Sequence, residues 1–202
     1  MEKIYNALME ILGKILGNSA RVKIMRLFLS NRGKGFANKD VAKRSRVTSD
    51  AVRREIRLLA SVNFIKKHGV NWSFNPAFKY GGEFEDLLLG SDTLSKEAIL
   101  ETFKKVGRVK LIVSSGVFIK NHDSRVDLLI VGDKMKRSKI EEGIKKIEAE
   151  MGGELVYAVF DTKEFLYRLN MYDKLVRDIL DYPHEIVLQT KELSPTLIAK
   201  KL

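Results

Sequence analysis

The first part of the chain alternates between helical hydrophobic patterns and short polar breaks. Apolar residues at Ile4, Leu8, Ile11 and Ile15 repeat at helical spacing and predict a helix over 2–16. Further helices are predicted over 20–29, 39–45 and 49–62, with N-caps at Ser19, Asn38 and Thr48. Asn63 suits the left-handed position that ends the last of these helices. Phe36 and Ala37 form a very short predicted strand, and a hairpin is expected over 64–74 with a two-residue turn at His68-Gly69.

The second part of the chain mixes helical and strand patterns. A helix capped by Ser95 is predicted, followed by strands separated by an amphipathic helix, then one or two helices over 162–181. The predicted strands are 108–116, 125–133, 154–160 and 184–189, and the amphipathic helix is 138–151. We expect domains at 1–92 (with a linker over 78–92) and 93–190, and a tail over 191–202.

Composition excludes several classes of protein. The longest apolar runs are far too short to span a bilayer, and the N-terminus lacks the pattern of a secretion signal. Without cysteine there is no disulfide, thiol nucleophile or thiolate metal site. The three histidines are far apart in sequence, and no nucleophile-elbow pattern is present. We therefore expect a cytoplasmic protein with no membrane partner, no metal and no cofactor.

The positive charge is concentrated in one segment. The chain carries a net +11, and residues 19–67 alone hold fourteen Lys or Arg against three acidic residues, which is also +11. A segment this basic favours a polyanionic partner, and nucleic acid is the commonest one in cytoplasm. A merely solvated surface is the alternative.

The predicted helices and hairpin of this segment have the order of a winged helix-turn-helix. In the helix over 49–62, Val52, Ile56 and Leu59 share one face, and the basic residues share the other. A basic face of this kind fits the major groove of double-stranded DNA. An ion pair between Asp50 and Arg54 is also expected. The candidate DNA-binding residues are Lys39, Arg46, Ser49, Asp50, Arg53, Arg54, Arg57, Lys66, Lys67 and His68.

The stretch "RVKIMRLFLSN…FANKDVAKRSRVTSDAVRREIRLLASVNFIKK" resembles the winged-helix domain of ArsR-like transcriptional regulators. "FNPAFKYGGEFEDLLLGSD" resembles the segment that links such domains to a nucleotidyltransferase-like domain. The resemblance implies a two-domain regulator in which the first helix helps to build a homodimer. Packing of that helix within its own chain is the alternative.

The stretch "SSGVFIKNHDSRVDLLIVGD" resembles the nucleotide-binding corner of nucleotidyltransferases. Active members place a Gly-Ser at a turn and two carboxylates, one residue apart, on the next strand, where they share magnesium. Here Gly-Ser falls on Gly116-Val117 and the carboxylates fall on Arg125 and Asp127, so the hydroxyl and one anion are missing. We expect no catalytic residues and loss of the reaction, with Arg125 paired to Asp127 or Asp123. A rearranged site that uses Asp123 or Asp161 is the alternative.

These observations predict an α+β or α/β protein of two domains: a winged helix-turn-helix followed by a small nucleotidyltransferase-like α/β domain. The expected function is transcriptional regulation through double-stranded DNA, with Gly116, Arg125 and Asp127 as a candidate site for a nucleotide or protein partner. Two other functions stay open: an active nucleotidyltransferase with a rearranged site, and an interaction protein that docks a partner.

Overall fold

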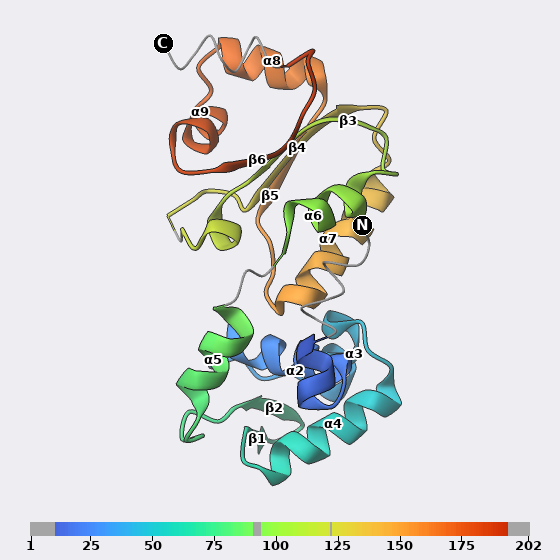
Figure 1. Cartoon of the computed structure of the whole chain (residues 1–202), viewed down its shortest axis with the longest axis vertical. Coiled ribbons are helices and arrows are strands. Elements are labelled where there is room, and N and C mark those ends of the chain that lie inside the picture. Colours follow the sequence, from blue (N-terminus) through green and yellow to red (C-terminus); the bar gives the residue numbers. More distant parts are fainter. Residues whose placement is uncertain (1–10, 91–93, 122, 194–202) are drawn as a thin grey trace. The chain divides into compact units, whose positions relative to one another are not determined.

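The computed structural model describes residues 11–90, 94–121 and 123–193, which form a mixed α/β fold in two compact units (Figure 1). Unit 1 holds the described residues up to 90 together with Ile144–Glu154. Unit 2 holds the remaining described residues. The expected domain ranges, 1–92, 93–190 and 191–202, stay predictions.

Unit 1 is built from helices and one antiparallel hairpin. Residues 11–16 are helical, while Ile4 and Leu8 of the expected first helix lie outside the described residues. The elements that follow are α2 (Ser19–Ser30), α3 (Asn38–Ser45), α4 (Ser49–Ser61), β1 (Ile65–His68), β2 (Asn71–Phe74) and α5 (Gly81–Leu89). Phe36 forms an isolated bridge with Trp72 on β2, so the very short strand expected at Phe36 and Ala37 is reduced to a single bridged residue.

Two of the three expected helix caps and the hairpin turn need correction. Thr48 caps α4 as expected, but Asn18, not Ser19, caps α2, because its side chain accepts from the backbone N–H of Arg21. Helix α3 begins at Asn38, so the N-cap is Ala37, which provides no side-chain hydrogen bond. The register pairs His68 with Asn71, which moves the two-residue turn to Gly69-Val70.

A buried arginine ties the ends of two helices to α2 within unit 1. The side chain of Arg26 is buried, and it donates to the carbonyl of Leu88 at 2.8 Å and to that of Glu150 at 3.0 Å. Leu88 lies in the last turn of α5 and Glu150 in the last turn of α7 (Arg137–Met151), where carbonyl groups have no partner inside their helix. The cation therefore satisfies acceptors at the negative ends of two helices.

The chain after α7 is pressed against the same helix α2. Asn31 donates from Nδ2 to the carbonyl of Gly152 at 2.7 Å, and Ser30 donates to that of Met151 at 3.2 Å. Gly152 has a φ of +79°, and a Cβ there would lie 2.4 Å from the carbonyl carbon of Arg26. The close approach requires glycine at this position.

Unit 2 is a four-stranded mixed sheet covered by helices. Its strands are β3 (Arg108–Ser114), β4 (Leu128–Asp133), β5 (Tyr157–Phe160) and β6 (Glu185–Gln189), in the order β5-β4-β3-β6. Only β4 and β5 are parallel. The helices of this part of the chain are α6 (Lys96–Phe103), η1 (Gly116–Ile119), the start of α7, α8 (Thr162–Asn170) and α9 (Lys174–Asp181).

Apolar residues on one face of the sheet pack against α8 and α9, and α6 with the start of α7 lies on the other side (Figure 1). Leu193, at the start of the segment expected as a tail, is buried in the same core, and Glu192 pairs with Lys110 at 2.5 Å. Residues 194–202 of that segment lie outside the described residues.

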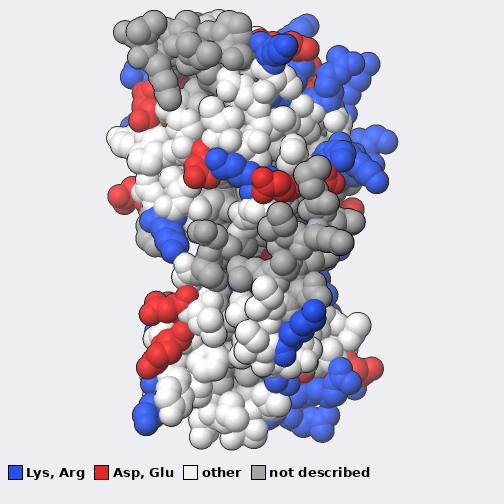
Figure 2. All heavy atoms as spheres, in the orientation of Figure 1, with Lys and Arg blue, Asp and Glu red and all other residues white. Residues whose placement is uncertain are grey.

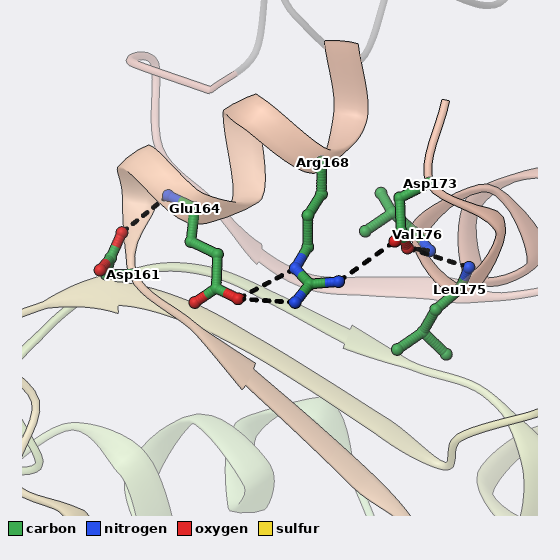
Figure 3. Close-up of polar contacts among 6 residues, drawn as sticks. All are labelled: Asp161, Glu164, Arg168, Asp173, Leu175 and Val176. Atoms are coloured by element: carbon green, nitrogen blue, oxygen red, sulfur yellow. Dashed lines mark hydrogen bonds and ion pairs between the residues drawn. The ribbon is translucent and has the colours of Figure 1, made fainter. Parts of the chain in front are cut away.

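An ion-pair network fixes the turn between α8 and α9 (Figure 3). Arg168 pairs with Glu164 at 2.9 Å and with Asp173 at 3.1 Å, and its guanidinium lies 4.9 Å from the ring centroid of Phe160. Asp173 also caps α9 by accepting from the backbone N–H groups of Leu175 and Val176. Because the charged groups of Arg168 and Asp173 are engaged by these contacts, the network stabilises the arrangement of α8 and α9.

Candidate functional site

The basic residues of α3, α4 and the β1–β2 hairpin form an exposed face of unit 1. On α4, Val52, Ile56 and Leu59 are buried, as expected, so the opposite side of the helix faces solvent. All ten residues expected to contact DNA are exposed: Lys39, Arg46, Ser49, Asp50, Arg53, Arg54, Arg57, Lys66, Lys67 and His68. In Figure 2, blue side chains gather over the part of unit 1 where Figure 1 draws α4. We call these ten residues the basic face.

Some cations of unit 1 contact groups of unit 1 itself, and others lie on the basic face. Five lie outside the basic face and contact carboxylates or carbonyls of unit 1: Arg21, Lys23, Arg26, Arg32 and Arg44. Within the basic face, Arg53 pairs with Asp50 at 3.2 Å. The expected pairing of Asp50 with Arg54 is therefore wrong, since Asp50 contacts the residue three positions along the helix. Arg54 keeps its charge available to a partner.

A buried carboxylate holds α4 in place. Glu55 is 4% exposed and accepts from Asn18 Nδ2 and from Arg21 Nε, both at 2.7 Å. Asn18 also caps α2, so one cluster fixes the start of α2 and the middle of α4. In the sequence, Glu55 is one of the three acidic residues of the basic segment. Its spacing, three residues from Val52 on the apolar stripe, was the signal that it faces inward.

The hairpin is anchored by Trp72, which is partly buried and packs against the core of unit 1. Its backbone exchanges hydrogen bonds with Phe36 at 2.8 and 2.9 Å, and its ring lies 5.7 Å from the ammonium of Lys67. Val70, in the turn, is 79% exposed. Lys66, Lys67 and His68 therefore lie exposed on β1. Strand β1 pairs with β2, and β2 is held by its bridge to Phe36.

The corner that resembles a nucleotidyltransferase site is closed by its own backbone. Asp127 is 8% exposed, and its carboxylate accepts from the amide of Val117 at 2.9 Å and from that of Val156 at 2.8 Å. Strand β4 begins at Leu128, so Arg125 and Asp127 precede the strand and do not share one of its faces. The expectation that they do was wrong because the backbone of Asp127 bonds to residue 156 before the β4–β5 pairing begins.

Arg125 pairs with a residue that sequence reasoning did not consider. Its guanidinium contacts the carboxylate of Asp178 on α9, not that of Asp127 or Asp123 as expected. Asp178 lies about fifty residues further along the chain, so nothing in the local sequence indicated this pairing.

Three further polar side chains near the corner have partners within unit 2. The hydroxyl of Ser115 donates to the carbonyl of Val126 at 2.5 Å, and that of Ser114 donates to Glu185 at 3.4 Å. Asp161, one of the two carboxylates that a rearranged site would use, caps α8 by accepting from the amide of Glu164 at 2.7 Å (Figure 3). Within the described residues, no group of three His, Cys, Asp or Glu side chains lies together as a metal site.

An internal ion-pair cluster lies at the far end of β4. Lys110 pairs with Asp133 at 2.9 Å, and the amide of Thr162 donates to the same carboxylate at 3.3 Å. The hydrogen bond from Lys110 is the main cause that lowers the pKa of Asp133 from 3.8 to about 2. The pKa of Lys110 is raised by its hydrogen bond to Glu192 and, next, by its hydrogen bond to Asp133.

Comparisons of the chain with protein-family models, with curated proteins and with solved structures give no match. None of the described helices has the length and apolar character needed to cross a membrane.

Proposed function

We propose that the protein is a DNA-binding transcriptional regulator, with unit 1 as a winged helix-turn-helix and α4 as its recognition helix. The observation that carries the proposal is the exposure of all ten residues of the basic face. The helices and hairpin of unit 1 follow in the order α2, α3, α4, β1, β2, as a winged helix requires.

The chemistry of the basic face suits duplex DNA. Lysine and arginine neutralise phosphates and release condensed counterions, and arginine also donates two hydrogen bonds to the edge of guanine. Arg54 and Arg57 lie on the exposed side of α4, where base edges would lie, and Lys66 and Lys67 lie on the hairpin, where the backbone would pass. We place the protein in the cytoplasm, where such a partner is found.

We also propose a homodimer formed through the first helix. Ile11 and Ile15 are 51% and 72% exposed, whereas Leu12 is buried in the core of unit 1. Two large aliphatic side chains on the solvent side of a helix favour a partner surface. A dimer would double the number of DNA contacts by binding two half-sites.

Unit 2, in our proposal, does not carry out nucleotidyl transfer. Both oxygens of Asp127 accept backbone hydrogen bonds, from the amides of Val117 and Val156. A metal ion at this carboxylate would have to displace these amides, which costs free energy.

Duplex binding across a salt series tests the regulator proposal. The native protein is compared with the triple variant Arg53→Ala, Arg54→Ala and Arg57→Ala on DNA from upstream of its own gene and on an unrelated duplex. The matched control is Lys163→Ala, Lys174→Ala and Lys191→Ala, which removes three exposed charges from unit 2. We expect a steep salt dependence that only the arginine variant reduces. Binding that is equally weak in all three proteins would contradict the proposal.

A partner-docking function is the competing proposal. Tight association with another protein chain, together with no duplex binding by the native protein, would favour it. Magnesium-dependent nucleotide turnover, lost on Asp127→Asn, would instead favour an enzyme.

A further inference from the structure

A cleft of about 520 Å³ opens in unit 2, beside the end of β4 and along the edge strand β5. Its walls include Lys134, Arg137, Ile140, Tyr157 and Val159. It lies at the opposite end of β4 from Asp127, so it is distinct from the closed corner described above. Its volume falls in the range of roughly 300–1,000 Å³ that is usual for small-molecule sites.

The turn that forms one wall of the cleft is tightly held. A Cβ at Gly132 would lie 2.4 Å from the carbonyl oxygen of Arg108, and one at Gly107 would lie 2.7 Å from the Cα of Met135. The amide of Lys136 also donates to the carbonyl of Val106 at 2.8 Å. Residues 106–108 and 132–136 therefore approach as closely as two backbones can, which fixes the wall in advance of any binding.

Lys134 lies in this turn with an unfavourable backbone conformation. Its φ is +51°, a region in which glycine or asparagine is the usual residue. Lysine at such a position loses stability relative to glycine, so its side chain is not explained by the fold. Within the part of the chain that the structure describes, the Lys134 ammonium has no ion-pair partner.

The charges around the cleft favour an anion. Of the four cations in residues 134–139, Lys134 and Arg137 line the cleft, whereas Lys139 donates to the carbonyl of Lys105 at 3.3 Å. The two carboxylates in the wall already have partners: Glu141 accepts from Arg137 Nε at 3.0 Å, and Asp161 accepts from the amide of Glu164 at 2.7 Å. The ammonium of Lys134 and the remaining N–H groups of Arg137 are therefore left for a ligand.

The rest of the wall is apolar. Ile140 is buried, Val159 is half-buried, and Tyr157, on the edge strand β5, is 38% exposed. Flat, partly exposed aromatic and aliphatic surface of this kind suits the face of a planar ring.

We propose that this cleft binds a small organic anion, with a planar apolar body against Tyr157, Val159 and Ile140 and a carboxylate or phosphate at Lys134 and Arg137. The proposal does not depend on DNA binding, because all of its residues belong to unit 2.

Calorimetric titration of the full chain with four probes tests the proposed anion site. Three of the probes share the naphthyl ring, and three carry a negative charge. The probes are 2-naphthoate, 2-naphthyl phosphate, 2-naphthamide (the ring without charge) and acetate (the charge without the ring). We expect saturable 1:1 binding of at least one naphthyl anion, with 2-naphthamide and acetate weaker by about tenfold or more. The preference between the first two probes distinguishes a carboxylate ligand from a phosphate ligand.

Two lysine variants with the same backbone conformation locate the site. Lys134→Gly removes the cation where glycine is better tolerated, so the fold is retained and its thermal midpoint is unchanged or higher. Lys120→Gly makes the same change at a φ of +56°, outside the cleft, and is the matched control. We expect Lys134→Gly to weaken anion binding by about tenfold and Lys120→Gly to leave it unchanged.

Three results would overturn the proposal: no binding of either naphthyl anion, equal binding of 2-naphthamide, or equal effects of the two lysine variants. Loss of binding on Arg125→Ala with none on Lys134→Gly would also do so, since it would place the ligand at the corner near Asp127.

Discussion

The carboxylate of Asp127 fills the space into which a side chain at Gly116 would project. A Cβ built on Gly116 would lie 2.0 Å from Asp127 Oδ1, and Gly116 has a φ of +56°. The two residues that resemble a nucleotide-binding pair are thus packed against each other, and each restricts what the other position can hold.

Replacing Gly116 by alanine should be costly for two separate reasons. The left-handed backbone costs roughly 1–2 kcal/mol, and the clash with Asp127 adds about 1–3 kcal/mol. Gly69 has a nearly equal φ of +58° with nothing within 4 Å of its missing Cβ, so Gly69→Ala measures the backbone cost alone. Chemical denaturation should give a larger loss of unfolding free energy for Gly116→Ala. Equal losses would show that Asp127 moves aside freely.

Replacing the buried Arg26 should destabilise unit 1 strongly. Arg26→Met retains much of the side-chain volume but leaves the carbonyls of Leu88 and Glu150 without this donor, at about 1–3 kcal/mol for each buried acceptor. Arg32→Met is the control, because Arg32 is 44% exposed in a surface pair with Glu85 that is worth about 0–1 kcal/mol. Thermal unfolding followed by circular dichroism should separate the two variants clearly. Similar midpoints would mean that water replaces the guanidinium of Arg26.

The acid sensitivity of unit 2 should depend on Asp133. The pKa of its carboxyl is about 2 in the folded protein and 3.8 ordinarily, so the unfolded chain takes up its proton first. The ion pair with Lys110 therefore stabilises the fold fully above pH 3.8, and this stabilisation is lost as the pH falls towards 2. Asp133→Asn should flatten stability against pH in this range, measured by denaturation at pH steps. Asp181→Asn, in an exposed pair with Arg177, should keep the native slope.

Removing the acidic residue of the basic face should strengthen DNA binding. Asp50 is exposed and holds Arg53 at 3.2 Å, so Asp50→Asn releases a cation and removes a charge that repels phosphate. We expect affinity at low salt to rise by about threefold, with a steeper salt dependence. Asp40→Asn, on α3, is the matched control for the change in net charge. If both variants bind equally more tightly, overall charge is responsible, and the orientation of α4 is not.

Much of the fold was predictable because its signals are local. The stripe of Val52, Ile56 and Leu59 indicated which side of α4 is buried, and Thr48 and Ser95 cap their helices as expected. Where two polar residues compete for a cap, the sequence does not decide. Asn18 caps α2 instead of Ser19 because Glu55, distant in sequence, holds its side chain in place.

The candidate sites were less predictable because they depend on distant contacts. The exposure of the basic face follows from helical periodicity, but the pairing of Arg125 with Asp178 follows from how α9 packs in unit 2. The cleft beside β5 was also missed. The wall of the cleft depends on the close approach of two chain segments, one around Gly107 and one around Gly132. These glycines are twenty-five residues apart in sequence.

The segment Ile144–Glu154 supplies carbonyl partners to Arg26, Ser30 and Asn31, although α5 and much of unit 2 separate it from them in sequence. A gene fragment that ends near codon 92 would therefore encode unit 1 without one of its own packing elements. A recombination event that replaced the front half of this gene with that of another gene would also have to supply an α7 whose end packs against the new helices. The two halves are consequently expected to be inherited together, and a single crossover between them would leave both products incomplete.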